Sequence, residues 1–230
     1  METDRTKKDI AIDISKSIVS ECPYVGSLVS EVIGSLIPNQ RIDRISEFIK
    51  KLDSRVGKLE QQHVSDRFQE PEFVDLLENG FLQASRALSE ERLDYLANLF
   101  EKTLTEEELN HIENKRILVL LGELNDVEII MLQSYSTHPD EEPEFFERHK
   151  HILTPPAADK ASPVTEFDKE AIFQSHRRHL IRLELIEPNF KKPRKGQLPD
   201  FDLKTGMIKA SGYKITYLGQ MLLNRITESV

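Results

Sequence analysis

Apolar residues that recur every three or four positions constrain the fold of this 230-residue chain more than any other feature. The clearest block spans residues 42–59, where the apolar positions are three, four, three, four and three apart. This spacing places side chains on one face of an α-helix, whereas a half-buried strand needs strict alternation. We therefore expect a mainly α-helical protein. The face consists of Ile42, Ile45, Ile49, Leu52, Val56 and Leu59.

The apolar face of residues 42–59 can be used in two ways. Its β-branched residues at every a position and Leu at two of three d positions favour a two-stranded coiled coil, and hence a homodimer. The pattern lasts only about two and a half heptads, fewer than the three or four that identify a coiled coil. A helix inside a monomeric bundle carries the same face. Both interpretations remain open.

The segment 24–37 has a second helical pattern with an unusual opposite face of Gly and Ser. Small residues there allow close packing of two helices, but they also occur in helices that lie on membrane surfaces. The segment has no basic residue to attract anionic lipid, so packing is favoured and membrane contact is the weaker alternative. Its aliphatic positions are Val25, Leu28, Val29, Val32, Ile33, Leu36 and Ile37.

Residues 71–136 read as consecutive helices that are separated by capping signals. Thr105 with Glu108, and Asn125 with Glu128, have the spacing of capping boxes, in which side chains satisfy the free N–H groups of a helix start. The apolar runs 117–121 and 129–132 predict helices at the centre of the core. A short strand is the alternative for the first run.

Composition divides the chain further. After Ser136, residues 144–151 fit a short helix, whereas residues 154–163 contain Pro155, Pro156 and Pro163 and have no periodicity, which indicates a loop or linker. We expect four parts: N-terminal helices (1–70), a helical core (71–136), a linker (137–165) and a C-terminal module (166–230).

Charge is distributed unevenly along the chain. Residues 166–230 hold 12 Lys and Arg against 8 Asp and Glu, whereas residues 1–165 hold 19 against 32. A basic module on an acidic body points to a polyanionic partner, although chance variation produces similar differences. The single cysteine, Cys22, cannot form an internal disulfide, and no stretch is apolar enough to span a bilayer, so we expect a cytoplasmic protein.

The C-terminal module combines a helix, a strand, a basic loop, a second strand and a closing helix. Residues 179–187 look like a third helix that enters a β-hairpin, and residues 215–219 look like a second strand that enters the last helix. In both segments the chain resembles the winged-helix family. The resemblance extends over roughly residues 123–230 if the helix 125–136 is the first helix of the module.

The winged-helix resemblance implies duplex DNA as a partner, with the helix in the major groove and the wing on the backbone. The acidic residues Glu166, Asp168 and Glu170 at the start of the same helix oppose such contact, and winged helices also bind proteins. The candidates on the helix are Lys169, Gln174, Ser175, Arg177, Arg178 and Arg182. The candidates on the wing are Lys191, Lys192, Arg194 and Lys195.

The sequence contains no recognisable catalytic, metal or cofactor pattern. His176 and His179 are three positions apart on one helical face, but no carboxylate stands at a recognised metal spacing, so we expect solvated or phosphate-bound histidines. The leading hypothesis is a homodimeric, non-enzymatic DNA-binding regulator. A scaffolding protein and a peripheral membrane protein are the alternatives.

Overall fold

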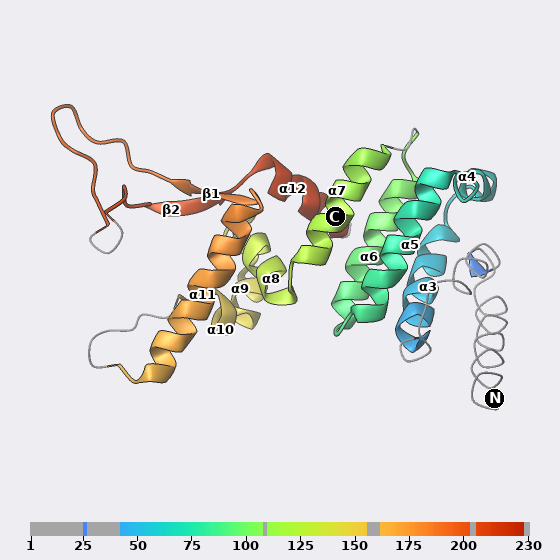
Figure 1. Ribbon diagram of the computed structural model, residues 1–230, viewed down its shortest axis with the longest axis horizontal. Coiled ribbons are helices and arrows are strands. Elements are labelled where there is room, and N and C mark those ends of the chain that lie inside the picture. Colours follow the sequence, from blue (N-terminus) through green and yellow to red (C-terminus); the bar gives the residue numbers. More distant parts are fainter. Residues whose placement is uncertain (1–24, 27–41, 108–109, 156–161, 203–205, 228–230) are drawn as a thin grey trace, which may run out of the picture. The chain divides into compact units, whose positions relative to one another are not determined.

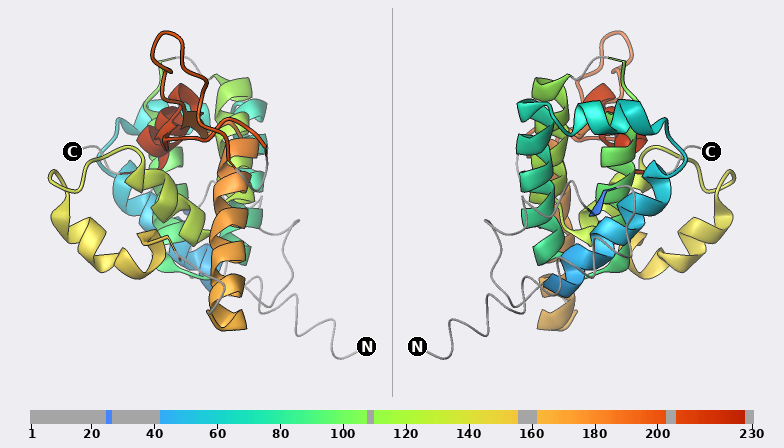
Figure 2. Two further views of the ribbon diagram at one scale, coloured as in Figure 1. Left: turned by 90° about the vertical axis from the view of Figure 1, so that its left-hand side faces the viewer. Right: turned by 90° about the vertical axis from the view of Figure 1, so that its right-hand side faces the viewer.

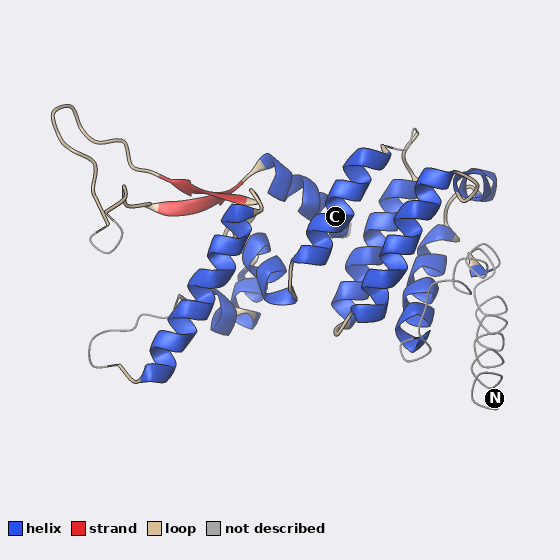
Figure 3. Ribbon diagram, viewed as in Figure 1, coloured by secondary structure: helices blue, strands red, loops and turns tan. Residues whose placement is uncertain are grey.

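The chain folds into helices and one β-hairpin that form two compact units. Unit 1 comprises residues 1–123 and 224–230, and unit 2 comprises residues 124–223, so unit 2 is an insertion in the sequence of unit 1. The mainly α-helical class is confirmed, and within the described residues strands occur only in an antiparallel pair near the C-terminal end (Figure 3). The computed structural model describes residues 25–26, 42–107, 110–155, 162–202 and 206–227 (Figure 1).

Unit 1 is a helical bundle. Pro71 begins one helix, where its missing N–H is not needed, and the Ser89 hydroxyl accepts a hydrogen bond from the Arg92 backbone N–H at 3.2 Å to begin the next. The helices are α3 (Ile42–Val56), α4 (Gln61–Arg67), α5 (Pro71–Arg86), α6 (Glu90–Leu104) and α7 (His111–Glu123).

Aromatic rings fill the core of unit 1. Phe48 meets Phe81 and Phe100 edge to face, each with ring centroids 5.9 Å apart, and Phe73 meets Phe100 at 6.0 Å. Such edge-to-face pairs add to the free energy gained by burial. Gly80 allows the close approach of α5 and α6, because a Cβ there would overlap the ring of Phe100.

The apolar face of α3 is used inside this bundle. Ile45, Ile49, Leu52 and Val56 are fully buried within the single chain, where α3 packs against α5 and α6. This burial matches the interpretation of α3 as a helix inside a monomeric bundle. A dimer through the same face would have to open the core of unit 1. Leu59, the last residue of the pattern, is only half-buried. The side chain of Ile42 lies outside the described part.

The prediction for residues 24–37 falls almost wholly outside the described residues. Val25 and Gly26 are the exceptions, and the Val25 backbone N–H donates to the Asp53 carboxylate at 2.9 Å. Within the ranges that the structure describes, no helix has the length and apolar character needed to cross a bilayer.

The start of α7 differs from the prediction. Thr105 does not begin this helix, because its backbone is helical and continues the last turn of α6. The cap is Asn110, whose side chain accepts from the Glu113 backbone N–H at 3.2 Å and donates to the Glu113 carboxylate at 3.0 Å. Glu108 lies outside the described residues. The run 117–121 is helical, but Val119 is 42% exposed, so this run is not buried all round.

Unit 2 combines helices with the hairpin. The capping box of Asn125 and Glu128 begins α8 as expected. The short helix expected at residues 144–151 is present as two helices, one of which, α10, packs against α8. The elements are α8 (Asp126–Ser134), α9 (Pro143–Arg148), α10 (Lys150–Leu153), α11 (Val164–Arg182), β1 (Ile186–Asn189), β2 (Gly212–Ile215) and α12 (Tyr217–Ile226), which ends in unit 1.

The hairpin begins at the C-terminal end of α11, as Figure 1 and the left view of Figure 2 show. Ile186 pairs with Ile215, and Asn189 pairs with Gly212. The Thr216 hydroxyl donates to the Glu184 carbonyl at 2.6 Å and accepts from the Gly219 backbone N–H at 3.1 Å. One side chain therefore joins the turn after α11 to the start of α12.

Candidate functional site

The connection between the two strands is a long arm that carries the predicted basic residues. Its two sides pair again beyond β1 and β2, where Phe201 forms a bridge with Ile208 and the Lys209 N–H donates to the Asp200 carbonyl at 2.7 Å. Residues 190–211, which we call the hairpin arm, project from the hairpin (Figure 1). All four predicted wing residues are exposed on it: Lys191, Lys192, Arg194 and Lys195.

These four cations form no ion pair with the residues that the structure describes. Several basic residues of unit 1 differ in this respect. Lys51 and Arg55 bind Asp94 at 2.9 and 3.0 Å, and Arg67 binds Glu70 at 2.9 Å. The hairpin arm thus presents a cluster of uncompensated positive charge within five consecutive positions.

Two of the predicted helix residues share an exposed face of α11. Arg178 and Arg182 are exposed, lie one turn apart and form no ion pair within the described part of the chain. The acidic residues that oppose polyanion binding are in the first half of the helix. Glu166 and Glu170 precede Arg178 by twelve and eight residues, which corresponds to about 18 and 12 Å along a helix.

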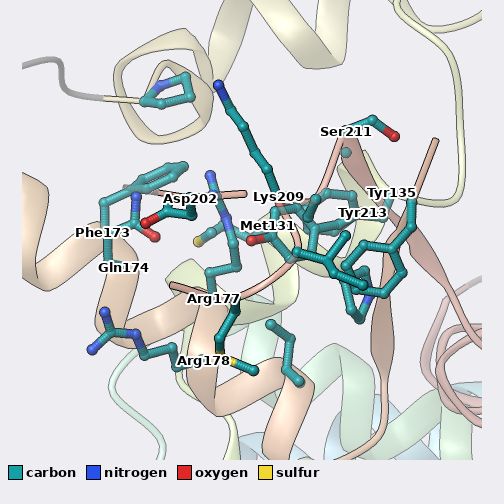
Figure 4. Close-up of a pocket in the computed structure, with 18 of the residues that line it drawn as sticks. Met131, Tyr135, Phe173, Gln174, Arg177, Arg178, Asp202, Lys209, Ser211 and Tyr213 are labelled. Atoms are coloured by element: carbon teal, nitrogen blue, oxygen red, sulfur yellow. The ribbon is translucent and has the colours of Figure 1, made fainter. Parts of the chain in front are cut away.

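Arg177 has a different environment from its neighbour Arg178. Its guanidinium lies over the rings of Phe173 and Tyr213, at 4.8 and 4.7 Å from their centroids. Its Nε atom is buried and has no hydrogen-bond partner. In Figure 4 the two arginines leave α11 in different directions. Arg177 therefore joins α11 to β2. It was predicted as an exposed residue that contacts DNA, but its side chain packs inside unit 2 instead.

A cavity of about 1150 Å³ surrounds the Arg177 side chain within unit 2 (Figure 4). Its walls come from α8, α11 and both sides of the hairpin arm. Gln174, another predicted residue, is half-buried and lines this cavity. Tyr135 also lines it, and burial raises the pKa of this phenol above its ordinary value of 10.0, although the charge of Arg177 opposes the shift.

Two histidines of α11 share one buried carboxylate. The Nδ1 atoms of His176 and His179 lie 3.1 and 2.8 Å from Oε1 of Glu128, which also accepts the Asn125 N–H through Oε2. Burial raises the pKa of Glu128, but the Asn125 N–H and the two imidazoles together lower it below its ordinary value of 4.5. No group of three His, Cys, Asp or Glu side chains in the described ranges could hold a metal ion.

The Glu128→Gln variant is expected to lower the free energy of unfolding at pH 7 by about 2 kcal/mol, because hydrogen bonds to a charged acceptor are lost. The folded-state pKa of Glu128 is lowered, so its contribution is present above pH 4.5 and disappears as the pH falls below that value. Urea denaturation at several pH values between 5 and 3 measures this dependence. The stability difference between the two proteins should shrink across that range.

The Glu142→Gln variant removes an exposed carboxylate of unit 2 and serves as the control. It should unfold like the parent at every pH. If Glu128→Gln and Glu142→Gln gave the same pH dependence, Glu128 would not be the carboxylate that the two histidines stabilise.

The chain was compared with models of protein families, with curated proteins and with solved structures. No model of a protein family, no curated protein and no solved structure matches this chain. The candidate site consists of the exposed cations of the hairpin arm and α11, and of the cavity around Arg177.

Proposed function

We propose that this protein binds duplex DNA through unit 2. The observation that carries the proposal is the clustering of exposed cations that have no ion pair within the described residues. Other exposed cations, such as Arg86 and Arg116, are scattered along unit 1. A polyanion that binds such a cluster releases its counterions, which provides most of the free energy of association. The contact residues are Arg178, Arg182, Lys191, Lys192, Arg194 and Lys195.

The order of elements in unit 2 supports a winged-helix-like arrangement. A hairpin follows directly after α11, and the closing helix α12 follows the hairpin. In winged helices the helix before the hairpin enters the major groove, while the hairpin contacts the backbone. Lysines on the hairpin arm suit phosphates, which carry no sequence information, and Arg178 and Arg182 suit the edges of guanine.

Binding of the full-length chain to a short labelled duplex, followed by fluorescence anisotropy, tests the proposal. Four phosphate contacts from the hairpin arm predict a slope of about −4 in a plot of log K against log salt. Affinity should therefore fall by more than about a hundredfold between 50 and 200 mM salt. Absence of binding at low salt, or binding that does not respond to salt, would overturn the proposal.

A protein partner is the second candidate, and the first half of α11 favours it. Val164, Phe167 and Ile172 are 74%, 45% and 59% exposed, and they stand among acidic residues that repel DNA. Exposed apolar side chains that gather on one helix indicate an interaction surface. The variant Phe167→Ser with Ile172→Ser separates the two candidates, because it should leave binding to the duplex unchanged.

A further inference from the structure

The cavity in unit 2 is large enough for a small molecule, since its volume of about 1150 Å³ exceeds the roughly 300–1,000 Å³ of typical ligand sites. It is open to solvent on one side, and both polar and apolar groups line it. The apolar walls come from three elements: Met131 of α8, Ile181 of α11, and Phe190, Phe201 and Ile208 of the hairpin arm.

The guanidinium of Arg177 lies at the wall of this cavity, where it also donates a hydrogen bond to the hydroxyl of Tyr135. The rings of Phe173 and Tyr213 hold its plane in place, and its Nε–H has no acceptor although it is buried. A buried donor without an acceptor is unfavourable, and a guanidinium fork binds a carboxylate through two parallel hydrogen bonds. The arrangement therefore favours a ligand that brings a carboxylate or a similar anion.

The other polar residues around the cavity support the same charge preference. Arg178 and Lys209 add positive charge, while Glu170 and Asp202 supply the negative charge, so the basic residues are in excess. Gln174 lies three positions from Arg177 on the same helix and contributes a neutral amide.

We propose that this cavity binds a small organic anion with an aromatic or aliphatic body. The anionic group lies against Arg177, and the apolar body lies against the walls from α8 and the hairpin arm. This site goes beyond the proposed function, because of the proposed DNA contacts only Arg178 lines it, and the exposed cations of residues 191–195 do not. Since its walls belong both to α11 and to the hairpin arm, a bound anion ties the basic loop to the helix.

Isothermal titration of the full-length chain with 1-naphthoate tests this proposal, and uncharged 1-naphthylmethanol is the matched ligand. One naphthoate should bind per chain, at least about tenfold more tightly than the alcohol, because a charged acceptor strengthens the hydrogen bonds from Arg177. Equal affinity for both compounds, or uptake of many molecules per chain, would overturn the proposal.

Two variants locate the site. Gln174→Glu adds a negative charge to the cavity and should weaken naphthoate binding at least about tenfold while the Arg177 stack stays in place. Arg177→Met should remove the preference for naphthoate over the alcohol, with the fold checked by circular dichroism. Unchanged naphthoate affinity in Gln174→Glu would contradict this location.

The control is the pair Lys191→Gln and Lys192→Gln, which lies outside the cavity. This variant should bind naphthoate like the parent chain and bind DNA more weakly. The anion site and the DNA proposal can therefore fail independently. Loss of naphthoate binding in this control would move the anion site to the exposed loop and overturn the proposal.

Discussion

Changing Lys191, Lys192, Arg194 and Lys195 together to Gln is expected to weaken the binding of duplex DNA by about a hundredfold at low salt. Each side chain is exposed on the hairpin arm and has no ion pair within the described residues. Each phosphate contact that is lost leaves one counterion on the DNA, so the salt slope should fall by about one per residue. Fluorescence anisotropy at several salt concentrations measures both the affinity and the slope.

A matched control separates a local contact from the effect of net charge. Four other exposed cations can be changed to Gln, which alters the net charge of the chain by the same amount. These cations belong to unit 1, which carries none of the proposed contacts, and salt screens the remaining effect of net charge, so this control should change the affinity less than about threefold. Equal losses in both variants would contradict a binding site on the hairpin arm. The control positions are Lys50, Lys58, Arg86 and Arg116.

Local patterns in the sequence predicted the helices well and one helix start wrongly. The capping box of Asn125 and Glu128 depends on neighbours in the sequence, and it formed as predicted. The start of α7 was predicted wrongly, although Asn110 and Glu113 have the same local spacing as Thr105 and Glu108. The backbone of Thr105 is helical and continues the last turn of α6, so the later pair caps α7.

The candidate site could be predicted only in part, because some of its contacts join residues that are distant in the sequence. The basic residues of the hairpin arm are visible in the sequence, whereas the contact between Arg177 and Tyr213 joins residues 36 positions apart. A signal was nevertheless present in the sequence. Phe173 and Leu180 define the buried face of α11, and Arg177, four positions after Phe173, lies on the same side of the helix. Nothing local indicated that Glu128 would meet the two histidines.

The end of the chain is expected to contribute strongly to unit 1. In this unit Ile226 is fully buried, and its carbonyl accepts from the Asn98 side chain at 2.8 Å. Arg225 forms ion pairs with Glu106 and with Glu113, the second at 3.3 Å. The last turn of α12 therefore completes a core whose other helices end at residue 123.

The double variant Arg225→Ala with Ile226→Ala is expected to lower the free energy of unfolding by about 4 kcal/mol. An Ile-to-Ala change in a core costs about 2–5 kcal/mol, and loss of Arg225 leaves the largely buried Glu106 carboxylate without its partner. Denaturation followed by circular dichroism measures the change, and hydrogen exchange of α5 and α6 assigns it to unit 1.

The control for this variant lies on the same helix. Tyr217 and Met221 are 96% and 38% exposed, and changing both to Ala should alter the stability by less than about 1 kcal/mol. If the Arg225 and Ile226 variant behaved like this control, the last turn of α12 would not belong to the core of unit 1. If the Arg225 and Ile226 variant loses protection from hydrogen exchange in α5 and α6, unit 1 needs the last turn of α12 for its full stability. The core of unit 1 then depends on residues from both sides of the insertion.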